Sequence, residues 1–143
     1  MTFILDPQLQ KDTHLMGHLP LCTLLLNRDK TFPWFILVPQ IANIRELYQL
    51  SIGQQNQFMK ESSLVSEILD DTFTPDKLNI AALGNVVTQL HIHHVVRYKT
   101  DQAWPAPIWG QQKEIYYSQQ EAHEITDRIN HSLCKRAPEY LSV

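Results

Sequence analysis

Three of the seven histidines, His91, His93 and His94, fall within four positions of one segment. Their neighbours are apolar or β-branched, which is typical of a strand, and successive side chains of a strand point to opposite faces. Gln89, His91 and His93 therefore share one face, while His94 shares the other with apolar residues. Two imidazoles and an amide in a row can supply a nucleophile, a proton donor and hydrogen bonds around a space the size of a phosphate. We interpret this row as a catalytic surface.

The same two histidines are open to another chemistry. His-x-His spacing on one strand also suits a zinc, iron or manganese ion, so a metal-dependent enzyme with His91 and His93 as ligands is an alternative. Such a site needs a third or fourth ligand. The candidates are His123 or a distant glutamate, and neither has a spacing that places it on the same face.

The histidine segment belongs to a predicted antiparallel sheet. Residues 19–26 and 34–39 are apolar or β-favouring and flank a polar turn, which predicts a hairpin. Residues 77–82 and 88–98 are the next two strands, and the short turn between them makes them antiparallel neighbours. At least four strands are therefore expected.

Helices are predicted to pack against this sheet. Residues 52–69 carry one apolar stripe at helical spacing and end before the acidic pair 70–71. Ser118 and Glu121 form a capping box in front of a second helical stripe, and Asn43 is a candidate cap for a shorter helix. The order strand, strand, helix, strand, strand, helix indicates an α+β domain.

Composition excludes several classes of function. The 143 residues carry a formal net charge of -3 and no run of Lys or Arg, which argues against a general nucleic-acid or membrane-surface binder. Four glycines form no Gly-rich phosphate loop. The longest apolar runs are far shorter than the ~20 residues of a membrane-spanning helix. Two cysteines without C-x-x-C spacing or a secretory signal indicate reduced thiols, so we expect a cytoplasmic protein. From the charge and the short apolar runs we expect neither nucleic-acid nor membrane partners.

Segment 89–95 resembles the His-x-His-x-His signature of the histidine triad (HIT) family of nucleotide hydrolases and transferases. In that family a hairpin with Asn or Asp near its turn precedes a helix and two antiparallel strands, the second of which carries the signature. Asn27, the helix at 52–69, Asn79 and His91 occur here in that order. The resemblance spans roughly the first hundred residues and implies a HIT-like antiparallel sheet of about five strands with helices packed on it.

The resemblance implies roles for individual residues. His91 takes the middle position, whose imidazole attacks the α-phosphorus and becomes transiently nucleotidylated. His93 takes the third position, which donates to a phosphate oxygen or assists the leaving group. Gln89 stands in place of the first histidine, and its amide can also donate and accept hydrogen bonds. His94 replaces an apolar residue and is interpreted as a core or subunit-contact histidine.

Binding residues are implied in the same way. Asn27 matches a position that holds the ribose hydroxyls, although a turn role explains it equally well. Asn79 lies near the position where an amide touches the phosphate, and Asn85, in the following turn, is a third nucleotide-binding candidate. Residues 33–34 are Pro-Trp where relatives often have Gly-His. Arg97 and Lys99 follow the motif and could offset phosphate charge, but we interpret them as a solvated strand end.

Together these observations predict a HIT-like nucleotide-binding and catalytic domain over 1–103. Residues 104–143, a Pro/Trp segment and the C-terminal helix, are expected to pack on the same domain. The implied activity is a nucleotidyl hydrolase or transferase that acts on a dinucleoside polyphosphate or nucleoside phosphoramidate without a cofactor, as a homodimer. Gln89 and Trp34 leave a non-catalytic nucleotide-binding module as an alternative.

Overall fold

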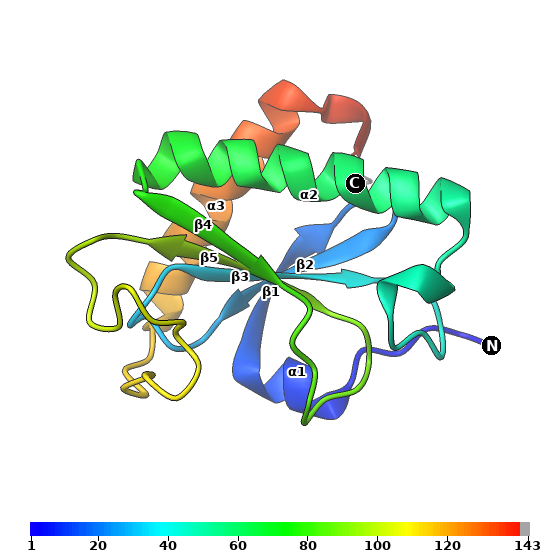
Figure 1. Cartoon of the computed structure of the whole chain (residues 1–143). Helices are drawn as coiled ribbons and strands as arrows, with labels where there is room; N and C mark the ends of the chain where they lie inside the picture. The colour runs from blue at the N-terminus through cyan, green and yellow to red at the C-terminus, as the bar shows by residue number, and fades with distance from the viewer. Residues whose placement is uncertain (141–143) are drawn as a thin grey trace.

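The computed structural model of the chain describes residues 1–140. The fold is built on a five-stranded antiparallel sheet in which the strands lie in the order β1-β2-β3-β5-β4 (Figure 1). The strands are β1 (Thr13–His18), β2 (Cys22–Asn27), β3 (Trp34–Pro39), β4 (Lys77–Ala81) and β5 (Ile92–Arg97). The predicted α+β class, with an antiparallel sheet of about five strands, is confirmed.

The helices in residues 1–140 are α1 (Pro7–Asp12), η1 (Leu47–Gln49), α2 (Ile52–Phe73), α3 (Gln119–Arg136) and η2 (Pro138–Tyr140), where η denotes a 3-10 helix. Both long helices begin with a serine capping box, closed by Gln54 in α2 and by Glu121 in α3. The capping box predicted at Ser118 is confirmed. α2 continues past the predicted end at residue 69 because the acidic pair 70–71 is exposed to solvent, and it stops at a left-handed Thr74.

Two N-terminal elements were not predicted from the sequence. α1 is one short polar helix in which only Leu9 is buried, so it has no apolar stripe to recognise. β1 is interrupted by a register shift between Leu15 and Gly17, which breaks the alternation expected of a strand. Both elements precede the predicted hairpin, and β1 adds an edge strand to the sheet.

Other predicted boundaries are also wrong, and the strand expected over 19–26 runs from Cys22 to Asn27. The helix expected after Asn43 is replaced by η1, which Glu46 caps, and Asn43 itself has a positive φ of 60° that is incompatible with a helix start. The last strand begins at Ile92 rather than at residue 88, because the Leu90 N–H bonds to the carbonyl of Ile44 and not to a neighbouring strand.

The two faces of the sheet bury different cores. One face packs against α2 and α3, through residues that include Leu24, Leu26, Phe35, Leu37, Ile92 and Val96. The opposite face packs through Leu25, Trp34, Ile36 and Val95 against Leu9 of α1 and Ile108 of the loop after β5. Figure 1 shows α2 and α1 on opposite sides of the sheet. The alternation along β5 places His93 on the α1 side and His94 on the α2 side, as predicted.

Buried polar contacts fix α2 on the sheet. The fully buried Glu61 carboxylate accepts the N–H groups of Leu21 (2.9 Å) and Cys22 (2.8 Å). Ser62 Oγ lies 2.7 Å from Nε2 of His94, whose other ring nitrogen contacts the Ile92 carbonyl. Burial lowers the pKa of His94 to about 4, so the ring is neutral at pH 7. His94 is thus a core histidine, one of the two roles predicted for it.

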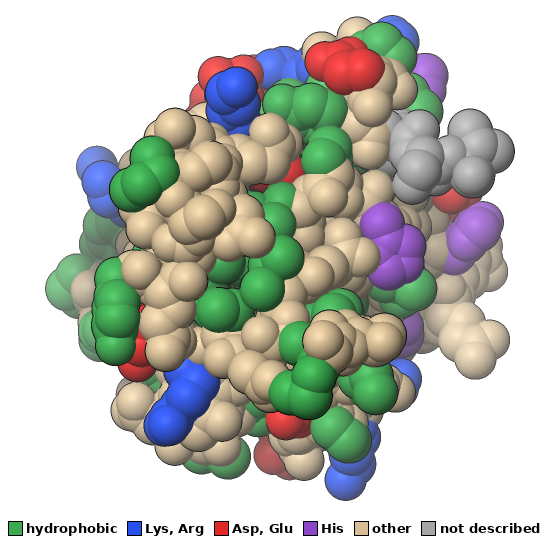
Figure 2. All heavy atoms as spheres, turned by 90° about the vertical axis from the view of Figure 1, so that its right-hand side faces the viewer, with side chains coloured by type: hydrophobic (Ala, Val, Ile, Leu, Met, Phe, Trp, Pro, Cys, Tyr) green, Lys and Arg blue, Asp and Glu red, His purple; other side chains and the backbone are tan. Residues whose placement is uncertain are grey.

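Neither long helix is apolar enough to cross a membrane, and the same holds for every helix in residues 1–140. On the face shown in Figure 2, hydrophobic side chains occupy the middle, while Lys, Arg, Asp and Glu side chains are scattered around the edge. That face therefore carries no concentrated patch of one charge.

Candidate active site

A cavity of about 740 Å³ opens on the α1 side of the sheet. Its wall includes His91 and His93 at the start of β5, Trp34 of β3, Asn27 at the end of β2, and Trp109 from the loop after β5. The lining combines aromatic rings with amide, imidazole and charged groups. Such a mixed cavity suits a ligand that has both an aromatic part and a polar or charged part.

His91 is held in one tautomer by the backbone. Its Nδ1 lies 2.7 Å from the carbonyl of Gln89, and because a carbonyl oxygen only accepts, Nδ1 must carry the proton. The other nitrogen, Nε2, then has a free lone pair and bonds to no group in residues 1–140. The ring is 5% exposed and lines the cavity. The arrangement provides an oriented nucleophile or base at the cavity wall.

His93 is bonded at both ring nitrogens. Nε1 of Trp34 lies 2.9 Å from Nδ1, and the carbonyl of Leu83 lies 3.2 Å from Nε2. An indole N–H only donates and a carbonyl only accepts, so the ring is neutral with its proton on Nε2. Burial and the nearby His91 lower the pKa of His93 to about 4, despite a hydrogen bond to the backbone that opposes the shift.

The aromatic rings of the cavity pack edge to face. The centroids of His91 and His93 are 4.8 Å apart, with 77° between the planes. Trp109 is 5.3 Å from His93 and 6.2 Å from Trp34, again nearly perpendicular to both. These contacts fix the two catalytic candidates against a rigid wall.

The side chain of Gln89 faces away from the cavity. Its Oε1 accepts the N–H of Asp6 at 2.9 Å, and its Nε2 donates to the carbonyl of Ile4 at 2.8 Å. Gln89 therefore ties the segment before α1 to the start of β5. It contacts His91 through its backbone carbonyl, whereas the sequence pattern placed its side chain beside the two imidazoles.

The three asparagine candidates end up in different places. Asn27 lines the cavity and also accepts the N–H of Asp29 at 2.9 Å, so it has the turn role and remains free to donate from Nδ2. Asn85 lines the cavity from the loop between β4 and β5. Asn79 is not brought to the cavity, because its Oδ1 accepts a hydrogen bond from Arg97 at 2.6 Å.

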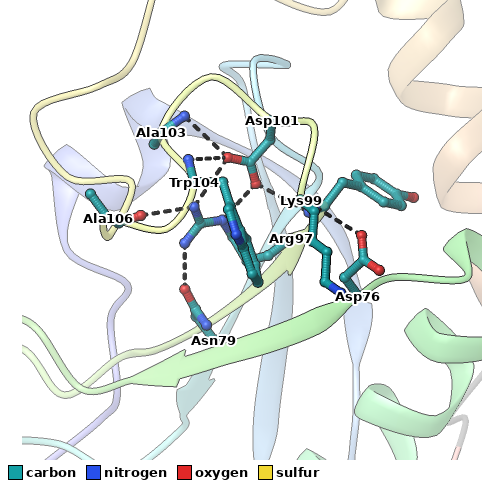
Figure 3. Close-up of polar contacts among 9 residues, drawn as sticks. Asp76, Asn79, Arg97, Lys99, Asp101, Ala103, Trp104 and Ala106 are labelled. Carbon is teal, nitrogen blue, oxygen red and sulfur yellow. Dashed lines mark hydrogen bonds and ion pairs between the residues drawn. The ribbon is translucent and has the colours of Figure 1, made fainter.

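Arg97 is buried, so its assignment as a solvated strand end is wrong. Its side chain is 2% exposed, and the guanidinium donates to Asp101, Asn79 and the carbonyl of Ala106 (Figure 3). The rings of Phe32 and Trp104 lie 5.7 and 5.6 Å from it. These bonds replace hydration of the charge and fasten the Pro/Trp loop to β5 and β4.

The segment 112–117 forms another wall that sequence reasoning missed. Backbone hydrogen bonds join it to the β2–β3 turn, and the buried carboxylate of Asp29 accepts the N–H of Glu114 at 3.0 Å. Tyr116 and Tyr117 then line the cavity. Burial and nearby carboxylates raise the pKa of Tyr117 to about 12. Both tyrosines lie in a stretch with no helical or strand period, so only their aromatic character could have signalled a role.

In residues 1–140 no group of three or more His, Cys, Asp or Glu side chains is arranged to hold a metal ion. His93 would have to give up Trp34 or Leu83 to become a ligand, since both of its nitrogens are bonded.

The fold and the cavity define a class of small antiparallel α+β domains in which histidines at the start of a central strand face a ligand-sized hollow. The family model described as the HIT domain matches residues 8–100. This chain belongs to the histidine triad (HIT) family, as the sequence resemblance predicted. HIT proteins are nucleotide-binding proteins that include hydrolases and transferases.

Solved structures of histidine triad proteins resemble most of the chain. The protein from Marinobacter aquaeolei VT8 is 44% identical with a TM-score of 0.91, and the match covers 96% of this chain and 100% of that one. Those from Sinorhizobium meliloti 1021 (39% identity) and Bradyrhizobium japonicum (38%) each have a TM-score of 0.89 and cover 92% of this chain and 98% of their own. A comparison with curated proteins gave no match.

Proposed function

We propose that the protein is a nucleotidyl hydrolase or transferase that acts at the α-phosphorus of a nucleotide conjugate, either a dinucleoside polyphosphate or a nucleoside phosphoramidate. The observation that carries this proposal is the 2.7 Å contact between Nδ1 of His91 and the carbonyl of Gln89. It leaves a lone pair on Nε2 of a ring that lines a mixed cavity. Membership of the HIT family supports the substrate class.

The reaction takes place in two displacements. The Nε2 lone pair of His91 attacks the α-phosphorus, and the bond to the leaving group breaks with its electron pair on the leaving group. Water or another acceptor then attacks the phosphorus, the P–N bond electrons return to Nε2, and the acceptor loses its proton to solvent. The Gln89 carbonyl stabilises the positive charge that the nucleotidylated ring carries. Orientation of the ring before attack contributes several kcal/mol in well-positioned systems.

Residues around His91 would bind the rest of the substrate. Asn27 has a free amide donor for a ribose hydroxyl, and Asn85 lies on the loop that passes beside His91. Trp109 offers an aromatic surface for the base. His93 shapes the wall next to the reacting phosphorus. Asn79, implied by the resemblance, is bonded to Arg97 and is not included in this binding set.

The proposal includes a cytoplasmic homodimer. The free thiols of Cys22 and Cys134 fit a reducing compartment. Both outer strands, β1 and β4, have an edge without a neighbour in residues 1–140, and each exposes a large apolar side chain, Leu15 and Ile80. Sedimentation at micromolar concentration should give twice the chain mass, and a monomer would reject this part.

A substrate panel with intact-mass detection tests the activity. Diadenosine polyphosphate, adenosine phosphoramidate and the p-nitrophenyl ester of AMP are mixed with the protein, and rapid quenching is followed by mass measurement and peptide mapping. We expect AMP release and an adenylyl adduct on His91. His91→Ala should lose about 10³-fold or more in kcat/KM while still binding AMP. His123→Ala, on the exposed face of α3, is the matched control and should retain full activity.

Two outcomes would contradict the proposal. Binding without turnover across the panel would favour the non-catalytic module. Full activity in the His91 variant, or an adduct on another residue, would assign the chemistry elsewhere.

A further inference from the structure

Trp34 and Leu83 together immobilise the proton of His93. Trp34 occupies Nδ1 at 2.9 Å as a donor, and the Leu83 carbonyl takes the Nε2 proton at 3.2 Å. A histidine that protonates a leaving group needs a proton on a nitrogen directed at that group, and it needs to exist as an imidazolium for part of the time. Here neither nitrogen is free, and an imidazolium could not accept the Trp34 N–H.

We propose that Trp34 is a specificity-determining residue that restricts this site to substrates whose leaving group departs as a stable anion, such as a phosphate or polyphosphate chain. This inference rests on the proposed function and deepens it. Conjugates with an amine leaving group are disfavoured, because an amine must gain a proton as its bond to phosphorus breaks.

The balance of protons distinguishes the two substrate types. When Nε2 of His91 attacks a phosphoanhydride, the electron pair of the breaking P–O bond stays on a phosphate oxygen, which is stable as an anion at pH 7 and needs no proton. When it attacks a P–N bond, the departing nitrogen has to take a proton from a neighbouring acid. A neutral His93 cannot provide it, and with a pKa of about 4 only about one ring in a thousand is charged at pH 7.

The other titratable groups of the cavity come from different elements. Lys11 and Asp12 belong to α1, His14 to β1, and Arg28 and Asp29 to the β2–β3 turn, while Glu114, Tyr116 and Tyr117 lie in segment 112–117. Among the rings in residues 1–140, His93 is the one that packs against His91, at 4.8 Å. This imidazole contacts the attacking ring, so whether it can give up a proton bears directly on which leaving groups the site accepts.

Matched substrates test the inference directly. The p-nitrophenyl ester and the benzylamide of AMP share the nucleotidyl group and differ in the atom that leaves. For the unaltered protein we expect kcat/KM for the ester to exceed that for the amide by about 100-fold or more, the usual contribution of a general acid. Nitrogen-15 NMR of the histidine rings at pH 7 should show His93 with its proton on Nε2.

Trp34→Phe removes the indole N–H but keeps an aromatic ring in the wall. Because Nδ1 of His93 is then released, the ratio of kcat/KM for the ester to kcat/KM for the amide should fall about tenfold. The pH at which the NMR signals of His93 titrate should rise. Trp109→Phe is the matched control, because Trp109 packs on the same ring at 5.3 Å without bonding to it. It should leave the ratio unchanged, whatever it does to substrate affinity.

The possible failures are distinguishable. If no substrate gives an adenylyl adduct, the proposed function fails. If adducts form on His91 but the unaltered protein cleaves the amide as fast as the ester, or NMR finds the His93 proton on Nδ1, only the role of Trp34 is overturned. Those two outcomes need no variant, so either one overturns the role of Trp34 even if Trp34→Phe does not fold.

Discussion

The guanidinium of Arg97 and the carboxylate of Asp101 form a two-point ion pair almost closed to solvent. Nε lies 2.8 Å from Oδ2 and Nη2 lies 3.1 Å from Oδ1, with the side chains 2% and 9% exposed. Asp101 also accepts the N–H groups of Ala103 and Trp104, which gives the loop after β5 its shape (Figure 3). The last residue of β5 thus fixes the loop that places Trp109 against His93.

Asp101→Asn removes the charge while it keeps an oxygen for the loop N–H groups. We expect the free energy of unfolding to fall by about 3 kcal/mol, because Arg97 is left as an uncompensated buried charge. Urea unfolding measures the change. The control is Glu67→Gln, which weakens an exposed 3.3 Å pair with Arg136 and should cost less than about 1 kcal/mol. Equal costs for the two variants would show that the buried pair does not stabilise the fold.

Stability should fall with acid in a defined range. Burial lowers the pKa values of His93 and His94 from 6.5 to about 4. Between those values the unfolded chain binds protons that the native chain does not, so the free energy of unfolding decreases as the pH falls from 6.5 towards 4. Each ring contributes up to about 1.4 kcal/mol per pH unit there. Urea midpoints measured between pH 7.5 and 4.5 record the slope.

Histidine variants separate this effect from carboxylates that titrate in the same acid range. His94→Gln retains a polar partner for Ser62. Because the variant lacks one buried imidazole, its free energy of unfolding should depend less steeply on pH, by up to about 1.4 kcal/mol per pH unit. Gln119→Ala, which replaces an exposed side chain of α3 that does not titrate, should keep the whole slope. A slope unchanged in the His94 variant would show that His94 is protonated in the native state.

The sequence predicted those features of the fold and of the site that depend on local residue patterns. Alternation along 89–97 placed His93 opposite His94, and the capping box at Ser118 placed the start of α3. The resemblance to HIT proteins predicted an antiparallel sheet of about five strands with helices packed on it. These features are encoded in spacings of two to four residues, which a single sequence displays.

The features that the sequence did not predict depend on contacts between residues far apart in the chain. Trp34 and His93 are 59 positions apart, and Gln89 and Ile4 are 85 apart. No local rule states that Arg97 will be buried, because the charge is compensated by a loop that follows it and by Asn79 on another strand. The cavity wall at 112–117 likewise exists only through its pairing with the β2–β3 turn.

Gly84 leaves just enough room for the His91 ring. A Cβ at this position would lie 2.6 Å from the Val87 carbonyl oxygen and 3.3 Å from Cε1 of His91. Gly84→Ala must therefore shift the loop or the ring, and we expect a loss of about 100-fold in kcat/KM because the imidazole leaves its attack position. Assays with the p-nitrophenyl ester of AMP measure it.

Gly53→Ala is the matched control for the Gly84 variant. A Cβ at Gly53 would find its nearest atom, Ser51 Oγ, at 4.0 Å, and the residue lies in the first turn of α2. Turnover should not change, and stability should rise by up to about 1 kcal/mol. Full activity in Gly84→Ala would mean that the loop does not constrain His91.

Gln89→Ala separates the two roles of this residue. The variant keeps the backbone carbonyl that holds Nδ1 of His91 but loses the side-chain bonds to Ile4 and Asp6. We expect kcat/KM to stay within about tenfold of the unaltered protein, with the adduct still on His91, while the Asp6 amide exchanges its hydrogen faster. The exposed Gln119, replaced by Ala at the start of α3, is the control for both readouts. A loss as deep as that of His91→Ala would show that the Gln89 amide takes part in the chemistry, as the first position of the signature implies.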